Sequence, residues 1–250
     1  MRHTPDTIPS FVDNLARRPA LGASAAFRQF LLTGEEEHHV AISDAARLTA
    51  NARAMARPDA VNAFIYGRRV LDRMLAQSAC VGIRAYYGLH PNGMPTFVLS
   101  GVKPDGADIV DGVLAQDPVL RPAWCGAANV LNTGGRVEDL ESIRPEVLLT
   151  GAENSGVTPA EASRSTRLYR ITRISGSLKA HFFGRAIAEE VLGQAGCVGL
   201  RLYRAREENG RRTLVLVGVD ELGNDLVSGI LGEHVLDCPP WCSEVNSLNG

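Results

Sequence analysis

Four residues in the last quarter of the chain have side chains that bind metals or exchange disulfides. His234, Cys238 and Cys242 follow one another at intervals of four, and Cys197 precedes them. Three thiolates and an imidazole form a donor set for tetrahedral zinc. The C-x-x-x-C spacing differs from the C-x-x-C of thioredoxin-like proteins. The Pro-Pro-Trp segment between the two later cysteines excludes an ordinary helix, so the spacing does not align these ligands on one helical face.

The composition is typical of a globular protein, and the near-neutral net charge predicts no strongly charged partner. The chain has 250 residues, 45% of them hydrophobic and 22% charged, and a formal net charge of -2. This balance predicts no attraction to nucleic acid or to an anionic membrane. The first residues lack the apolar run of a secretory signal, and no segment approaches the roughly 20 apolar residues of a membrane helix. We therefore expect a cytoplasmic protein, and its odd number of cysteines suits reduced thiols.

Two stretches of the chain are similar to each other. Residues 31–133 align without a gap with residues 148–250, and about 38 of roughly 103 aligned pairs are identical. We call these ranges the N-terminal half and the C-terminal half. The alignment predicts a tandem duplication, preceded by an N-terminal arm over residues 1–30 and joined by a polar linker over residues 134–147.

We predict that each half begins with two helices. Thr158, with Pro159 next and Glu161 at the third helical position, forms a capping box, and Ser43 is the expected cap of the matching helix. A second helix is predicted over residues 61–75, because its apolar positions stay apolar in the other half. These matched pairs are Val61 and Leu178, Ile65 and Phe182, Val70 and Ile187, Met74 and Val191, and Leu75 and Leu192.

A short antiparallel meander is predicted after the helices, followed by a tail rich in Pro, Trp and Cys. Residues 81–87 alternate in polarity, as a half-buried strand does. An Asn-Gly pair at 92–93, and again at 209–210, predicts a hairpin with a type I′ turn. Third strands are expected around 108–114 and 225–231. Since so few strands are marginally stable alone, we expect an α+β fold whose halves pack together about a pseudo-twofold axis.

The alignment bears on the cysteine pair. Cys242 corresponds to Cys125, but Cys238 corresponds to Arg121, so the fold does not require a pair at this position. We therefore expect no bound metal and no cofactor. The tail is predicted to be a rigid clasp against the meander. The Trp side chains expected to pack there are Trp124 and Trp241.

One face of the first meander strand carries the same polar side chains in both halves. These residues, with an acid beyond the following hairpin, are Arg84, Tyr86 and Asp108, and Arg201, Tyr203 and Asp225. An Arg and an Asp on adjacent strands can form a structural ion pair. Alternatively, Arg and Tyr are common in binding hot spots, so the two faces could bind a ligand or a partner. We expect Arg84 to be the more buried arginine, because Tyr86 and Tyr87 follow it.

The unit CVG(I/L)R-x-Y…NG…T-x-VLxGV…GxD…P-x-WC resembles an uncharacterised family of short bacterial proteins that carry one such unit. The resemblance covers both halves most strongly from Cys80 to Trp124 and from Cys197 to Cys242. Arg121 departs from the family's C-P-x-x-C-type ending. The resemblance implies that one half is a structural unit of its own, and it implies no activity, cofactor or functional residue.

Three hypotheses on function remain open, and none rests on a catalytic motif, since no phosphate loop, nucleophile elbow or metalloprotease motif occurs. The leading hypothesis is a non-catalytic interaction or scaffold module that contacts a protein partner or itself through its duplicated surface. The second is a thiol- or metal-dependent protein, including an enzyme, that uses Cys197, His234, Cys238 and Cys242. The third is a protein that binds a small ligand in the cleft between the halves.

Overall fold

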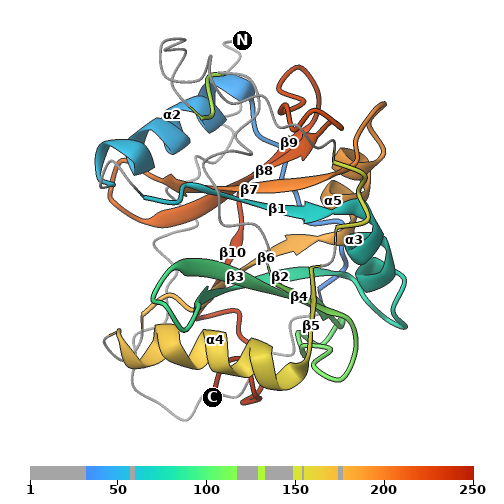
Figure 1. Ribbon diagram of the computed structural model, residues 1–250, viewed down its shortest axis with the longest axis vertical. Helices are drawn as coiled ribbons and strands as arrows, with labels where there is room; N and C mark the ends of the chain where they lie inside the picture. The colour runs from blue at the N-terminus through green and yellow to red at the C-terminus, as the bar shows by residue number, and fades with distance from the viewer. Residues whose placement is uncertain (1–31, 57–59, 117–128, 133–148, 154, 174–176) are drawn as a thin grey trace, which may run out of the picture.

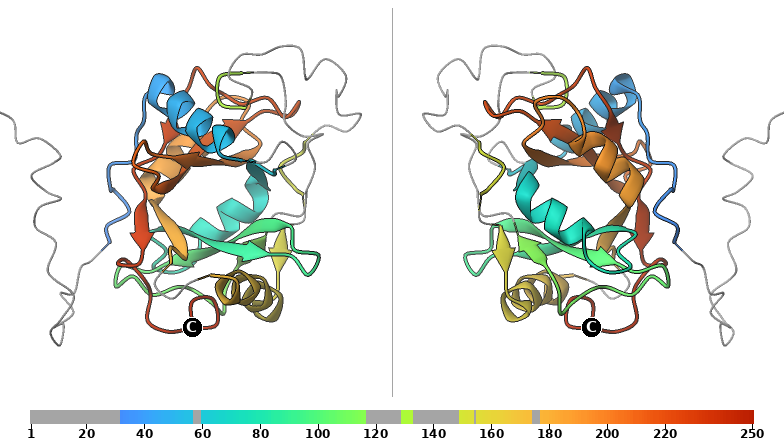
Figure 2. Two further views of the ribbon diagram at one scale, coloured as in Figure 1. Left: turned by 90° about the vertical axis from the view of Figure 1, so that its left-hand side faces the viewer. Right: turned by 90° about the vertical axis from the view of Figure 1, so that its right-hand side faces the viewer.

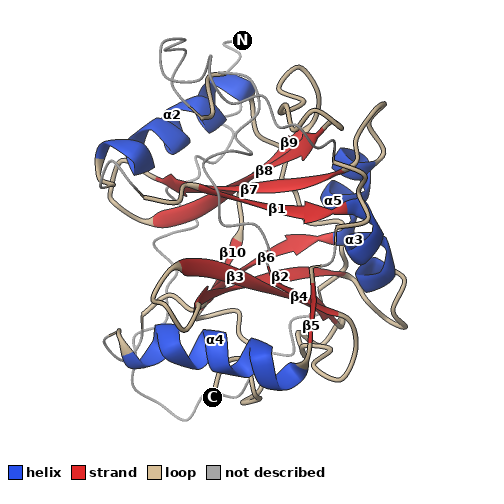
Figure 3. Ribbon diagram, viewed as in Figure 1, coloured by secondary structure: helices blue, strands red, loops and turns tan. Residues whose placement is uncertain are grey.

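The computed structural model shows two antiparallel sheets lying face to face, with helices around them (Figures 1 and 3). The structure describes residues 32–56, 60–116, 129–132, 149–153, 155–173 and 177–250. The predicted arm and linker, with Trp124 and Cys125, lie outside these ranges. The mixed helical and strand content confirms the α+β class. None of the described helices is long and apolar enough to span a membrane.

Both sheets are antiparallel throughout. The first has the order β1 (Ala63–Gly67), β7 (Gly199–Arg206), β8 (Arg212–Val219) and β9 (Leu231–Gly232). The second has the order β10 (Leu236–Cys238), β6 (Ala180–Gly184), β2 (Gly82–Leu89), β3 (Pro95–Val102), β4 (Leu114–Gln116) and β5 (Gly156–Val157).

Each sheet contains strands from both halves of the chain. In the first sheet, β1 of the N-terminal half pairs with β7, with Gly67 opposite Gly199. In the second sheet, β6 of the C-terminal half pairs with β2, with Gly184 opposite Gly82. The halves are therefore intertwined through exchanged strands.

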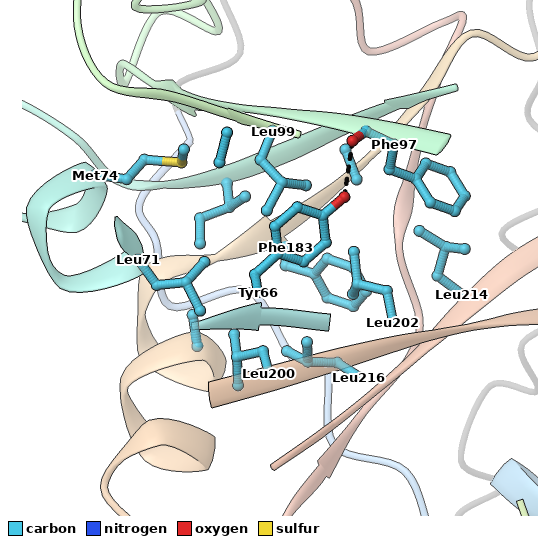
Figure 4. Packing of buried hydrophobic residues seen from close by; sticks show 14 of the residues in the cluster. Tyr66, Leu71, Met74, Phe97, Leu99, Phe183, Leu200, Leu202, Leu214 and Leu216 are labelled. Atoms are coloured by element: carbon cyan, nitrogen blue, oxygen red, sulfur yellow. Dashed lines mark hydrogen bonds between the residues drawn. The ribbon is translucent and has the colours of Figure 1, made fainter. Parts of the chain in front are cut away.

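The main core fills the space between the two sheets. Helices α3 (Arg68–Leu75) and α5 (Arg185–Leu192) close one side of this space (Figures 1 and 2). Tyr66 of the first sheet donates a hydrogen bond from its hydroxyl to the carbonyl of Phe97 of the second, at 2.7 Å, so this buried polar group is satisfied (Figure 4). The residues labelled around them are Leu71, Met74, Leu99, Phe183, Leu200, Leu202, Leu214 and Leu216.

Two further helices cover the outer faces of the sheets (Figure 2). Helix α2 (Ile42–Ala54) lies on β7 and β8 of the first sheet, and α4 (Pro159–Ile171) lies mainly on β2 of the second. Each helix therefore packs mainly on strands from the other half. Because both faces of β2 are covered, all its residues except Leu89 are buried, and the prediction of a half-buried strand is wrong.

The single helix predicted over residues 61–75 is instead a strand followed by a short helix. The same change of structure occurs in the C-terminal half, where β6 precedes α5. A short apolar run fits either a buried strand or a buried helix, and pairing with β7 decides it here. Gly67 joins β1 to α3, and a side chain there would meet the carbonyl oxygen of Gly151 at 2.8 Å.

The start of α4 confirms the predicted capping box. Thr158 accepts from the Glu161 amide, while the Glu161 carboxylate accepts from the Thr158 amide at 2.9 Å. The prediction for α2 is wrong. That helix has Ala41 as its N-cap and no side-chain cap, which leaves Ser43 inside the first turn.

The two predicted hairpins are present, although their turn type differs from the prediction. A type I′ turn needs positive φ at both central residues. In the β2–β3 turn Gly93 alone has it, at 82°, and its amide donates to the carbonyl of His90 at 2.8 Å. The third strands also begin later than expected, at Leu114 and Leu231, since a turn follows the isolated bridge between Val102 and Asp108.

Candidate functional site

The identical Arg and Asp side chains of the N-terminal half form a buried ion pair. The Arg84 guanidinium donates from Nη1 to Oδ1 of Asp108 at 2.5 Å. Both side chains are fully buried, with exposed fractions of 1% and 0%. The Tyr86 hydroxyl donates to Oδ2 of Asp108, also at 2.5 Å. Burial and the charge of Asp108 raise the pKa of Tyr86, so its phenol stays protonated and remains a donor.

The end of the chain covers this pair from outside. Arg84 donates from Nη2 to the carbonyl of Trp241 at 3.2 Å. Asn246 donates from Nδ2 to Oδ2 of Asp108 at 2.8 Å, and the Asp108 amide donates to Oγ of Ser243 at 3.1 Å. The expected clasp therefore acts through main-chain and polar groups, while the Trp241 residue remains 37% exposed.

The C-terminal half contains a second network of the same composition. Arg201 donates to Oδ1 of Asp225 and, at 2.9 Å, to the carbonyl of Gly223. The Tyr203 hydroxyl donates to Oδ2 of Asp225 at 2.6 Å, and Asn129 donates to the same oxygen at 2.8 Å. Asn129 lies in the N-terminal half, so each network is completed by an asparagine from the opposite half.

Of the two alternatives for these residues, the structure contains the ion pair in both halves. Arg84 and Arg201 are each 1% exposed, so the prediction that Arg84 would be more buried is wrong. The residue after the strand tyrosine does not decide burial, because covering segments from elsewhere in the chain enclose both networks. In this fold neither guanidinium is accessible to a ligand or to a partner protein.

The four proposed metal ligands do not come together. Cys238 and Cys242 form a disulfide, with Cα atoms 4.7 Å apart. Cys197 is a free thiol in the core between the sheets, and His234 is exposed. Within the described ranges, no three His, Cys, Asp or Glu side chains lie close enough together to hold a metal ion.

A hydrogen-bonded chain absent from the sequence predictions runs from the core to the surface. Oδ1 of Asp237 lies 3.0 Å from Nδ1 of the buried His181, whose Nε2 lies 3.0 Å from the Tyr87 hydroxyl. Because an ionised Asp only accepts, Nδ1 carries the proton and Nε2 accepts from Tyr87. Burial lowers the pKa of His181. Arg211 then joins Asp237, at 2.6 Å, to Glu207.

Beside this chain, two arginines of the first sheet project toward a pair of stacked tyrosines. The rings of Tyr87 and Tyr169 lie 5.2 Å apart at an interplanar angle of 17°. Arg212 donates to the Tyr169 hydroxyl at 2.8 Å, and its Cζ lies 5.9 Å from the centre of the Tyr87 ring. Arg204 donates to the carbonyl of Val61 at a long 3.5 Å. Neither arginine contacts a carboxylate within the described part of the chain.

A groove of about 540 Å³ opens next to Arg204. The end of α2, residues 60–62 and the β2–β3 turn line it from the N-terminal half, and Arg204 lines it from the C-terminal half. Its volume lies within the range of small-molecule sites. Its apolar lining includes Ala52, Met55, Val61, Met94 and Pro95.

The signal for these residues was a difference between the halves rather than an identity. His181 aligns with Phe64, Asp237 with Leu120, Arg212 with Pro95, and Arg204 with Tyr87. A polar or charged side chain has thus replaced an apolar or aromatic one on one side only. Residues that are identical in the two halves maintain the fold of both, whereas these four side chains are each present in one half only.

Comparison with known proteins adds no functional assignment to this geometry. No protein-family model, no curated protein and no solved structure matches the chain.

Proposed function

We propose that this protein is a non-catalytic binding module built from two intertwined repeats of one unit, and that a small ligand binds in the groove where the repeats meet. This is the third of the three sequence hypotheses. The groove carries the proposal, because it is formed by both halves and contains a half-buried arginine that has no carboxylate partner among the described residues.

The positions of the elements support the duplication. The first residues of α2 and α4, at 42 and 159, differ by 117, as do those of β2 and β7, at 82 and 199. The same offset relates the starts of β1 and β6, at 63 and 180. Two similar Arg–Asp–Tyr–Asn networks at matched positions agree with this origin.

Burial makes the scaffold hypothesis less well supported than ligand binding. A scaffold that used the Arg–Tyr faces needs them at the surface, and α2, α4 and the chain end cover them. A cytoplasmic location and a kinship with short bacterial proteins remain part of the proposal. The Cys238–Cys242 disulfide differs from the reduced thiols that we expect for that location.

A ligand-observed NMR screen of small aliphatic and aromatic fragments, neutral and anionic, tests the proposed site. Ala52→Trp places a large ring in the groove, whereas Ala50→Trp places one on the exposed side of the same helix. Fragments should bind the wild type and the Ala50 variant, and Ala52→Trp should abolish binding. No binding to the wild type, or equal binding to both variants, would exclude the groove. Circular dichroism establishes that each variant is folded.

A further inference from the structure

Arg204 gives the groove a cationic end, and neither Arg204 nor Arg212, which lies beside it outside the groove lining, contacts a carboxylate among the described residues. Arg204 and Leu214 are opposite each other in the β7–β8 ladder, and Arg206 is opposite Arg212. Arg204 and Arg212 are therefore diagonal neighbours on the face that also carries Leu214, which points into the space between the sheets. The Arg212 guanidinium meets the second sheet at the Tyr87 ring, and Arg204 donates to the carbonyl of Val61.

A third guanidinium adds to the positive charge. Arg173 lies over the Tyr169 ring, with its Cζ 5.0 Å from the ring centre. Burial, together with the like charges of Arg212 and Arg173, lowers the pKa of Arg204. Each of these effects disfavours the charged form of Arg204. A bound anion would offset them, because an opposite charge nearby favours the charged guanidinium.

Among the described residues, the two acids of the hydrogen-bonded chain that leads to Tyr87 are engaged by other groups. Glu207 accepts two hydrogen bonds from Arg211, and Asp237 accepts from Arg211 and His181. The same contacts hold Tyr87 in place through His181. The wall of the cationic end is thus fixed by its own hydrogen bonds before any ligand arrives, which reduces the entropic cost of binding.

We propose that the ligand of the groove carries an oxyanion, a carboxylate or a phosphate, which Arg204 and Arg212 bind while an apolar portion lies against the groove lining. This inference rests on the proposed function and specifies its ligand class. A guanidinium fork matches either oxyanion in geometry and charge. The apolar lining at Met55, Val61 and Met94 suits a hydrocarbon portion.

Calorimetric titration of the full chain with hexyl phosphate, hexanoate and 1-hexanol tests this ligand class. The three probes share one apolar chain and differ in the head group. At least one oxyanion should bind roughly tenfold or more tightly than the alcohol, as charge-assisted hydrogen bonds predict. Arg204→Gln and Arg212→Gln should each remove that advantage. Arg164→Gln, an exposed site on α4, should retain it.

The outcomes separate the ligand class from the site. The tighter of the two anions identifies the head group as phosphate or carboxylate. If 1-hexanol binds as tightly as both anions, or if both Gln variants retain the preference, the oxyanion inference fails, and the comparison of Ala52→Trp with Ala50→Trp then decides by itself whether the groove is the site. If none of the three probes binds, the result contradicts both proposals.

Discussion

Arg84 and Arg201 are large charged side chains that the fold keeps out of water. Such groups are costly to bury unless their charge and donors are matched. Asp108 and Asp225 provide the charge, and main-chain carbonyls accept further hydrogen bonds. Nε of Arg84 is the exception, a buried donor without an acceptor among the described residues. These residues therefore define which strands and loops meet, rather than offering a contact surface.

Removing one partner of the buried Arg84–Asp108 pair should lower the free energy of unfolding by far more than the about 0.2–1 kcal/mol that an exposed cross-strand pair contributes. Arg84→Ala leaves the Asp108 carboxylate buried without its cation, and the expected loss of unfolding free energy is about 3–5 kcal/mol. Urea denaturation measures it. The double variant Arg84→Met with Asp108→Leu should lose less than Arg84→Met alone. A loss below about 1 kcal/mol in Arg84→Ala, similar to that of the exposed Arg164→Ala, would contradict the burial argument.

His181 should make stability depend on pH. Burial lowers its folded pKa below the ordinary value of 6.5, so the unfolded chain takes up a proton first as pH falls. The stability contributed by neutral His181 is complete above about pH 6.5 and decreases below it by up to about 1.4 kcal/mol per pH unit. Burial lowers the pKa of His38 too and acts in the same direction.

Comparison of variants isolates the contribution of His181. The difference in unfolding free energy between pH 8 and pH 5.5 should be smaller in His181→Gln than in the wild type. His39→Gln removes an exposed histidine and should not reduce the acid-side loss. An unchanged pH profile in His181→Gln would show that the ring does not stay neutral in the fold.

Among the elements, the segment from β10 to the chain end does the most to bring distant parts together. β10 pairs with β6, and the residues after it cover the Arg84 network. Arg170 and Lys179 donate to carbonyls at the end of the chain. The Cys238–Cys242 disulfide closes a short loop within this segment.

Reduction of this disulfide should loosen the chain end without unfolding the sheets. A loop of this length contributes about 2 kcal/mol through the restricted unfolded chain. Tris(carboxyethyl)phosphine should lower the stability of the wild type by about that amount and speed hydrogen exchange at the Trp241 and Asn249 amides. Cys238→Ala with Cys242→Ala should already show both effects and should not respond further. A wild type that is insensitive to the reductant would refute the role of the bridge.

For the whole molecule, the exchange of β1 and β6 makes the two halves interdependent. Without its partner, each half loses the helix and the strand that cover its meander. A separated half therefore exposes strand edges and one side of the main core.

Residues 31–133 and 148–250, expressed separately, should each lack the near-ultraviolet circular dichroism of the intact chain. Mixed in equal amounts, they should associate and recover it, because the exchanged strands then find their partners. The intact chain at the same concentration is the control. If each half folds alone with a stability equal to that of the whole, the intertwined arrangement is not required.

The sequence by itself determined the features that depend on near neighbours. The Thr158 capping box, the hairpin at residues 92–93 and the strand alternation around Arg84 involve residues at most a few positions apart. The pairing of Arg84 with Asp108 was also foreseeable, because both halves repeat it. Residues 61–75 are a segment that the local sequence does not determine, since a short apolar run does not distinguish strand from helix without its pairing partner.

Tertiary structure alone decided which half covers which. Arg84 meets Trp241, and Tyr87 meets His181, across more than 90 residues of chain. Local sequence patterns report on residues within a turn or a strand, whereas burial depends on every segment that packs against a side chain. The polar alternation of β2 therefore predicted a solvent-facing side, and α4 with the chain end removed it from solvent. The groove and its arginines depend on the same crossing of the two halves.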